Sequence, residues 1–326
     1  MRLLTTLLFC LVFSFSISYA EYSRTELFVV PWGDGVSAFK AKQGKMIDPG
    51  TPENTLDDYY DSGDGPSKAF VDIHNNILIV SRWYEQIKEF NSSGELIYDF
   101  SEMPDFKEGN FRQGIANVFI DDKKNIYMFV DGLSYIPKIN YETSVIDSLI
   151  PYEGQRDVRI YSVSWTYYGK LMILDRNHGW VTFDGKYFVP GGDSQVYGLD
   201  GKYHSVVMRE PGNVKFFSFD FSDEWGTVSF ADSININIDA VNIKRTSLLN
   251  SFDSDYWYVQ VTIYGNNLIQ EVWKFDLSYN FIDKIALGAE PYYCAYWPKP
   301  FITADGTIYE FYPLDDGLHV SKWVEE

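Results

Sequence analysis

Four aspartates occupy a recurring place in this sequence and could together bind a metal ion. Each lies at or near the end of a short apolar run that is predicted to form a strand, and the four are Asp72, Asp121, Asp200 and Asp305. Carboxylate oxygens contributed by separate segments suit a hard cation such as Ca²⁺. The alternative is structural, because an aspartate before a Gly, Asn or Lys turn accepts local hydrogen bonds that stabilise the hairpin. The regular recurrence of this position favours the structural interpretation.

Aromatic side chains near predicted turns suggest binding rather than catalysis. They lie in or beside turns that join a second strand to a third, as do two further polar candidates; the six residues are Trp32, Trp83, Tyr84, Tyr135, Arg176 and His178. In a ring of stacked sheets these turns share one face, where exposed Trp and Tyr rings could stack on sugars or anchor a peptide. The alternative is that the rings pack between neighbouring sheets, which is the interpretation favoured for Trp180.

No motif for catalysis is present. The sequence contains no GxSxG elbow, phosphate-binding loop or HExxH zinc motif. No two histidines have the spacing of metal ligands, and the four are His74, His178, His204 and His319. The acidic run 57–65 does not follow the spacing of a calcium-binding loop. These features favour a binding protein over an enzyme, with no cofactor predicted and Ca²⁺ as the one ion to consider.

The segment Gly65–Phe100 reads as one complete four-stranded unit. Its apolar-rich runs are separated by turn residues, which is the pattern of short strands in an antiparallel sheet. The predicted strands are Ala69–Ile73, Ile77–Ser81, Gln86–Asn91 and Glu95–Phe100. One sheet of this size cannot bury both of its faces, so it needs copies of itself stacked on either side.

The central hairpin of this unit recurs along the chain. Each copy has an apolar strand, a polar or Gly-containing turn and a second strand, and the copies are Ile77–Asn91, Ile126–Asn140, Leu171–Gly185, Ser205–Asp220, Tyr258–Asp276 and Ile308–Glu325. Their spacing stays near the roughly 40–50 residues of a β-propeller blade. The sequence therefore predicts an all-β, six-bladed β-propeller of four-stranded antiparallel blades. The extra length of the fifth unit, Ser233–Asp255, is predicted to be a longer loop.

The two ends of the chain are each incomplete as blades. The last unit stops before a fourth strand, and the N-terminal segment contains a hairpin-like piece without a preceding inner strand. We therefore expect Leu27–Pro31 to supply the missing outer strand of the last blade, which closes the ring and removes an exposed sheet edge. The alternative is a seventh, incomplete blade.

Short motifs in the first unit carry a family resemblance. Gly65-Pro66 is followed by AFVD, then NNILIV, then IKEF and a Gly turn. This order resembles the NHL-type repeat of six-bladed β-propellers, and the segment from Trp32-Gly33 to Gly65-Pro66 is similar to that of secreted bacterial propeller proteins. The usual Asp-x-x-Asn-x-Arg turn of the repeat survives only as Asp175–His178 in the third unit. The resemblance implies a recognition scaffold and transfers no specific ligand.

The metal-dependent lactonases with a six-bladed fold are similar to this chain in outline. They bind a divalent cation on the ring axis through Glu, Asn and Asp side chains. This resemblance implies that the four aspartates named above would be axial ligands of a hydrolase, which is the alternative to a non-catalytic binding protein. A third reading is a structural component of a cell-surface assembly.

Residues 1–20 have the features of a secretory signal peptide. Arg2 supplies the positive start, an apolar core follows, and Ser18 and Ala20 form a small-residue cleavage site. We therefore expect a secreted, periplasmic or extracellular protein in which residues 21–326 form a single β-propeller domain. Cleavage removes Cys10, so that Cys294 has no partner for an intramolecular disulfide.

The charge of the chain limits which partners it is expected to bind. The formal net charge is −19 at pH 7, which argues against nucleic acids and anionic lipid surfaces. No stretch after the signal peptide is long and apolar enough to cross a bilayer. An extracellular protein or glycan is therefore the expected partner.

Overall fold

The structure of the chain is a computed structural model. It describes residues 21–41, 65–72, 74–81, 84, 86–100, 115–120, 126–130, 135–140, 145–151, 160–165, 171–175, 179–182, 188–189, 195–197, 203–210, 213–221, 228–237, 243–249, 255–264, 268–287 and 298–326.

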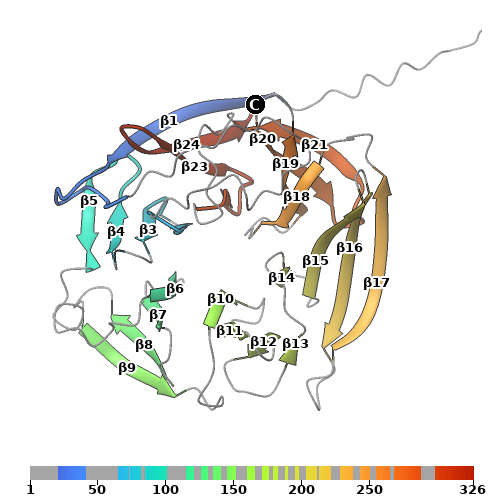
Figure 1. Cartoon of the computed structure of the whole chain (residues 1–326), viewed down its shortest axis with the longest axis horizontal. Helices are drawn as coiled ribbons and strands as arrows, with labels where there is room; N and C mark the ends of the chain where they lie inside the picture. Colours follow the sequence, from blue (N-terminus) through green and yellow to red (C-terminus); the bar gives the residue numbers. More distant parts are fainter. Residues whose placement is uncertain are drawn as a thin grey trace, which may run out of the picture.

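The described strands form six four-stranded antiparallel sheets. Figure 1 shows them set around a central axis; in the five sheets built from consecutive strands the first strand is innermost and the last outermost, whereas in the sixth sheet β1 is outermost. This arrangement confirms the predicted all-β propeller class. Within the described residues no helix is long and apolar enough to cross a membrane.

Five of the sheets use four strands that are consecutive in the chain. The first is β2 (Lys68–Val71), β3 (Ile77–Ser81), β4 (Gln86–Phe90) and β5 (Leu96–Asp99). The second is β6 (Ile115–Ile120), β7 (Ile126–Val130), β8 (Tyr135–Asn140) and β9 (Val145–Pro151). The third is β10 (Ile160–Trp165), β11 (Leu171–Asp175), β12 (Gly179–Thr182) and β13 (Phe188–Val189). The fourth is β14 (Gln195–Tyr197), β15 (Tyr203–Glu210), β16 (Asn213–Phe221) and β17 (Val228–Asn237). The fifth is β18 (Ile243–Leu248), β19 (Tyr256–Tyr264), β20 (Leu268–Asp276) and β21 (Phe281–Ala286).

The sixth sheet joins the two ends of the chain. Its order is β1-β24-β23-β22, and its strands are β1 (Tyr22–Pro31), β22 (Phe301–Ile302), β23 (Ile308–Leu314) and β24 (Gly317–Glu325). The N-terminal strand is thus the outer strand of the last sheet, as predicted, and it begins five residues earlier than the expected Leu27. β1 pairs with β24 along its length, from Tyr22 opposite Glu325 to Pro31 opposite Gly317, with one irregularity between Glu26 and Phe28.

The prediction of a long loop at Ser233–Asp255 is wrong. Its first part belongs to the outer strand β17 of the fourth sheet, and its second part contains the inner strand β18 of the fifth sheet. The run SININ alternates polar and apolar residues, which is sufficient for a strand at the outer edge of a sheet. The part of this region that the structure describes is therefore mostly strand.

Apolar side chains between neighbouring sheets hold the ring together. β3 is buried along its whole length, as expected for a strand covered on both faces by other sheets. One buried cluster joins the first and sixth sheets and includes Ile79, Phe90, Tyr309 and Val320. Another joins the fifth and sixth sheets through residues that include Tyr258, Val272 and Ile308.

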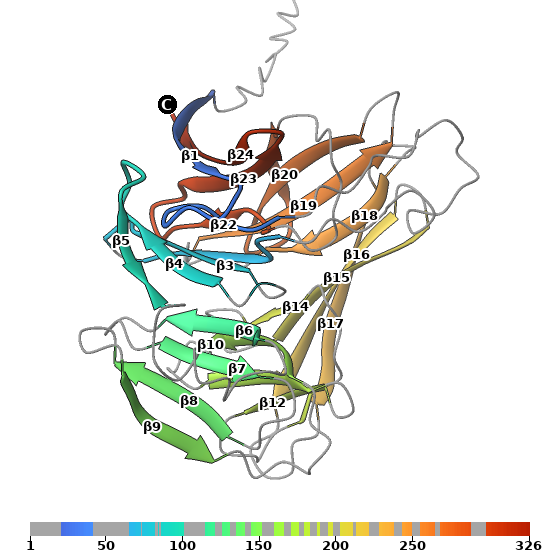
Figure 2. The same cartoon turned by 60° about the vertical axis from the view of Figure 1, so that its left-hand side comes forward.

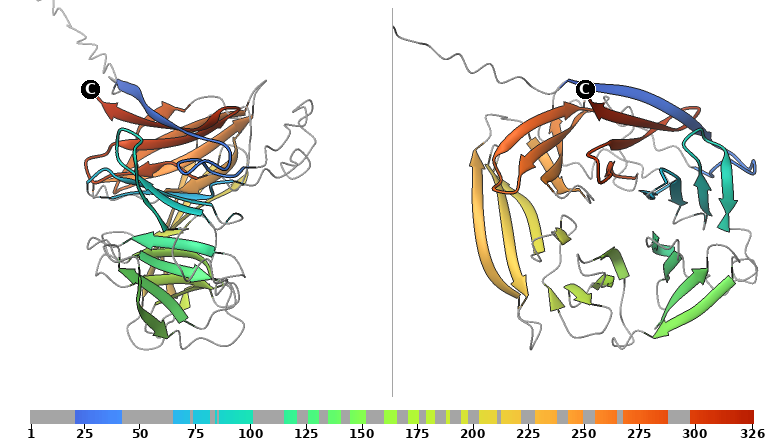
Figure 3. Two further views of the ribbon diagram at one scale, coloured as in Figure 1. Left: turned by 90° about the vertical axis from the view of Figure 1, so that its left-hand side faces the viewer. Right: turned by 180° about the vertical axis from the view of Figure 1, so that it is seen from behind.

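The antiparallel connections divide the ring into two faces. Turns between second and third strands lie on the same face as the connections from one sheet to the next, because β1 ends at Pro31 directly opposite Gly317 in the β23–β24 turn. Turns between first and second strands lie on the opposite face. Figure 2 shows the sheets side by side from an oblique angle, and Figure 3 shows the ring from the side and from behind. We call the first face the connection face and the second the turn face.

Candidate functional site

Trp32 lies on the connection face, directly after the closing strand. Its indole Nε1–H donates a hydrogen bond of 2.7 Å to the backbone oxygen of Leu314, beside the β23–β24 turn. The side chain is half-buried and packs against the apolar cluster between the first and sixth sheets. The ring is therefore fixed at one edge and partly open to solvent, which is a suitable state for an aromatic contact residue.

A buried lysine holds the segment that follows Trp32. The Nζ of Lys88 on β4 donates to the backbone oxygens of Val36 at 2.8 Å and Ala38 at 2.6 Å. It also lies 3.7 Å from a carboxylate oxygen of Asp99 and 5.3 Å from the centre of the Phe39 ring. Lys88 is only 2% exposed, whereas Val36 at the tip of the segment is 77% exposed. Residues 33–37 thus form an exposed loop tip whose backbone is held by the buried ammonium group of Lys88.

The neighbouring β3–β4 turn contributes Tyr84, which is half-buried. This turn is tied to the same segment, because the backbone N–H of Lys40 donates to Oε1 of Gln86 at 2.8 Å. Trp32 and Tyr84 therefore share the connection face of adjacent sheets. Tyr135 is the first residue of β8 and also begins at this face. Trp83, Arg176 and His178 lie outside the described residues.

On the turn face, the two described aspartate candidates each accept hydrogen bonds within their own turns. Asp72 accepts from the backbone N–H groups of His74 and Asn76, each at 2.8 Å. Asp305 accepts from the Thr303 hydroxyl at 2.6 Å and from the Thr307 N–H at 3.1 Å. The Thr303 hydrogen bond is the main reason that the pKa of Asp305 is lowered. Asp121 and Asp200 lie outside the described residues.

Tyr309 interacts electrostatically with the aspartates of both turns. Its hydroxyl donates a hydrogen bond of 3.1 Å to Oδ1 of Asn75, so the β23 strand of the sixth sheet reaches the β2–β3 turn of the first. Burial raises the pKa of Tyr309, and the negative charges of Asp305 and Asp72 raise it further. In the part of the chain that the structure describes, no three His, Cys, Asp or Glu side chains form a group that could hold a metal ion. Asp72 and Asp305 are therefore the two predicted metal ligands that the structure describes, and each accepts hydrogen bonds in its own turn.

A histidine that the sequence patterns did not single out lies at the ring closure. His319 on β24 has Nδ1 2.9 Å from Oε2 of Glu26 on β1 and Nε2 2.8 Å from Oδ1 of Asp316 in the β23–β24 turn. Burial alone would lower the pKa of His319, but the hydrogen bonds and negative charges of Asp316 and Glu26 outweigh it and raise the pKa. Its partner Glu26 is 293 positions away in sequence, so spacing gave no signal.

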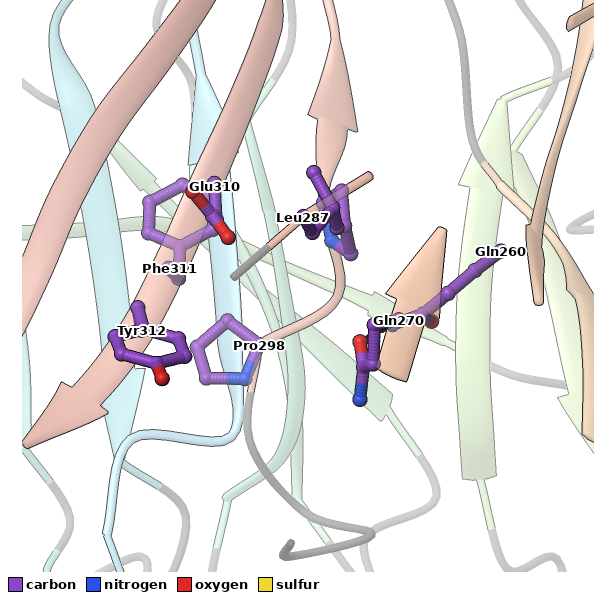
Figure 4. A pocket seen from close by; sticks show the side chains of 8 residues that line it. Gln260, Gln270, Leu287, Pro298, Glu310, Phe311 and Tyr312 are labelled. Carbon is purple, nitrogen blue, oxygen red and sulfur yellow. Dashed lines mark hydrogen bonds between the residues drawn. The ribbon is translucent and has the colours of Figure 1, made fainter. Parts of the chain in front are cut away.

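A cavity between the fifth and sixth sheets is too small for a typical ligand. Its free volume is about 10 Å³, which is close to the roughly 10–15 Å³ that a single water molecule needs. Figure 4 shows Gln270, Pro298 and Tyr312 around it. The buried Glu310 beside it already accepts hydrogen bonds from Arg24 at 3.1 Å and Trp323 at 3.0 Å. We therefore assign no ligand to this cavity.

Comparison with known proteins gives similarity at the level of fold. No family model matches the chain, and no curated protein matches it either. The fold is a β-propeller. Among solved structures, virginiamycin B lyase from Staphylococcus aureus is 14% identical, with 88% of this chain and 100% of that chain covered and a TM-score of 0.43.

Two further solved structures have TM-scores of 0.48. The PQQ-bound aldose sugar dehydrogenase from Streptomyces coelicolor is 10% identical, with 94% of this chain and 99% of that chain covered. A Bacteroides fragilis protein described as exported is 10% identical, with 91% and 99% covered. These similarities do not single out the NHL type that the first unit resembles. The propeller fold rests on the chain's own sheets, and no activity is transferred from these proteins.

Proposed function

We propose that this chain is an exported, non-catalytic propeller that binds an extracellular glycan or protein through its connection face. The observation that carries the proposal is the placement of Trp32. Its indole is held by the bond to Leu314 while the ring remains partly exposed, and half-buried Tyr84 lies on the same face of the adjacent sheet. Rigid aromatic rings of this kind supply stacking area at low entropic cost.

The anchored loop 33–37 extends the same surface. Val36 is exposed at the tip of the loop that follows Trp32, and Lys88 fixes the backbone of this loop. A surface held in one conformation before binding loses less entropy when a ligand arrives. The formal net charge of −19 favours neutral or cationic ligands over nucleic acids.

The test is binding of residues 21–326 to an array of neutral oligosaccharides, followed by titration of the best ligand against Trp32→Ala and Tyr84→Ala. We expect each substitution to weaken binding by about 30-fold, which corresponds to the ~2 kcal/mol of an interface hot spot. Phe281→Ala is the matched control, since Phe281 is a 41% exposed aromatic on the outer strand β21. Unchanged affinity in both variants, with folding intact by circular dichroism, would refute this choice of face.

The second candidate is a cation-dependent hydrolase, favoured by the placement of Asp72 and Asp305 in turns on the same face of adjacent sheets, where the negative charge of each raises the pKa of Tyr309. Carboxylates from adjacent sheets are suitable oxygen ligands for Ca²⁺. Thermal unfolding with EDTA and then with added Ca²⁺ separates the two candidates, because an ion bound only by the native state raises the unfolding temperature. A loss in EDTA that Ca²⁺ restores in the native chain, and not in Asp305→Asn, would support the hydrolase over the binding protein.

A further inference from the structure

The closing strand β1 is attached differently from every other described outer strand. In the first five sheets the outer strand follows its neighbour directly in the chain, whereas β1 and β24 come from opposite ends of the sequence. No short covalent turn therefore holds β1 in place. Its position depends on the ladder to β24 and on side-chain contacts across the sheet.

His319 provides one of these contacts in a form that requires a proton. Both of its ring nitrogens lie within hydrogen-bonding distance of carboxylate oxygens, from Glu26 on β1 and from Asp316 in the β23–β24 turn. An ionised carboxylate only accepts hydrogen bonds, and a neutral imidazole has a single N–H to donate. Both contacts are satisfied together only by the imidazolium ion. Deprotonation removes one of the two contacts and the charge that strengthens the other.

The surroundings of His319 contain no competing cation among the described contacts. Tyr312 is its cross-strand neighbour on β23, and Val29 is its neighbour on β1. Glu310, farther along β23, is paired with Arg24 of β1. The His319 side chain is 11% exposed, while the side chains of Glu26 and Asp316 are 50% and 68% exposed, so water screens part of their attraction.

The same turn that contains Asp316 also positions Trp32. Leu314, at the start of this turn, accepts the indole N–H of Trp32. Gly317, at its end, packs so closely on β1 that an added Cβ would lie 2.4 Å from the backbone oxygen of Val30. Through Asp316 and Glu26, His319 therefore ties together the closing strand and the turn that hold the proposed contact residue.

We propose that protonation of His319 tightens ring closure by β1 and thereby the placement of Trp32, so that the protein binds its ligand more tightly in weakly acidic than in alkaline medium. The part about ligand affinity rests on the proposed function; the part about β1 does not. The pKa of His319 is raised above its usual value of 6.5. The stabilisation is therefore fully present below that usual value and is lost as the pH rises through the higher folded-state pKa.

The test reads β1 directly, in ligand-free protein comprising residues 21–326. Hydrogen exchange of a peptide covering Tyr22–Pro31 is measured by mass spectrometry from pH 5.5 to 8.5 and corrected for the intrinsic exchange rate. We expect protection to fall by about three- to tenfold across this range, as one charge-assisted contact is lost. His319→Gln should remove the step, whereas His74→Gln, a change at an exposed turn histidine, should leave it intact.

Two milder variants keep the proposal falsifiable if His319→Gln fails to fold. Glu26→Gln and Asp316→Asn each replace one carboxylate, and each should lower the His319 pKa measured by NMR and shift the exchange step to lower pH. A His319 pKa at or below 6.5 in the native chain, or an exchange step that stays at the same pH in Glu26→Gln and Asp316→Asn, would overturn the proposal. Failure of the glycan screen would leave these results unaffected, so the two proposals fail separately.

Discussion

Replacing Lys88 by methionine should release the loop at residues 33–37 and lower the free energy of unfolding by about 3 kcal/mol. The ammonium group makes two hydrogen bonds to backbone oxygens, of Val36 and Ala38, in a site where the lysine is 2% exposed. Hydrogen bonds to charged groups contribute roughly 1.5–3 kcal/mol each. Methionine keeps most of the apolar stem, so little packing is lost. Part of the loss is recovered because the ammonium no longer has to be desolvated.

The matched control is Lys40→Met. Lys40 forms an ion pair of 3.2 Å with Asp34, but the two side chains are 53% and 87% exposed. A pair of this kind contributes ~0.5 kcal/mol or less. Urea unfolding of both variants gives the free energies, and hydrogen exchange of a peptide covering residues 33–39 reports the loop. A Lys88→Met loss below ~1 kcal/mol with unchanged loop exchange would refute the role assigned to Lys88.

The same experiment separates the loop from the indole. Trp32 has its own hydrogen bond to Leu314 and its own apolar contacts, so Lys88→Met should free the loop tip and leave Trp32 in place. If Trp32 is the main contact residue, ligand affinity falls only by the entropy of ordering the loop. A complete loss of binding in Lys88→Met would instead place the main contact on the loop itself.

Three further outcomes follow from single contacts. Gly317→Ala should cost about 1–3 kcal/mol in urea unfolding, because the new Cβ would lie 2.4 Å from the backbone oxygen of Val30; unchanged stability would contradict this close approach. The hydrogen bond from Lys274 lowers the pKa of Glu325, so its stabilisation is present above the usual carboxyl value of 4.5 and is lost as the pH falls through the lower folded value. Lys274→Met should therefore flatten the fall in stability, measured by urea unfolding, as the pH drops below 4.5, and an unchanged profile would contradict this role. Tyr279→Asn should relieve backbone strain, because asparagine tolerates the φ of 64° at this position better than tyrosine. It should still lower the free energy of unfolding by ~1–2 kcal/mol net, because the tyrosine ring contacts three aromatic neighbours. A gain in stability would refute this balance.

The sheets could be predicted because each central hairpin joins strongly apolar strands through recognisable turn residues. Ile77–Ser81 was predicted with its observed bounds, and it is buried throughout. The outer strand β17 was missed because a strand at the edge of a sheet needs fewer apolar residues. The start of β1 at Tyr22 was missed for the same reason, since its first half is rich in polar residues.

The contacts at the candidate sites were harder to predict because they join distant segments. A local pattern sufficed to suggest that Asp72 accepts hydrogen bonds in its own turn, which the structure has. The hydrogen bond from Tyr309 to Asn75 joins residues 234 positions apart, and no sequence motif predicts it. His319 was a single histidine without a spaced partner in the sequence, and its two carboxylate neighbours become evident only when β1 is placed beside β24.

The register of β1 explains why a proton could act on one half of this strand. Before the irregularity, Tyr22, Arg24 and Glu26 lie opposite alternate residues of β24 that begin at Glu325. After it, Phe28 and Val30 lie opposite the intervening residues, because one unpaired residue reverses which side chains share a face.

The two halves of β1 are consequently held by different forces. The first half is held by polar contacts to Glu325, Glu310 and His319, all on one face of the sixth sheet. The second half places Val30 in the apolar cluster with the first sheet, where no group titrates near neutral pH. Loss of the His319 proton should therefore loosen β1 first in its N-terminal half, and hydrogen exchange resolved along the strand should rise first at residues 22–26. The effect on Trp32 then passes through Asp316 and the β23–β24 turn rather than along β1. Equal loosening of both halves would mean that β1 detaches as a unit and that the irregularity at Leu27 does not separate them.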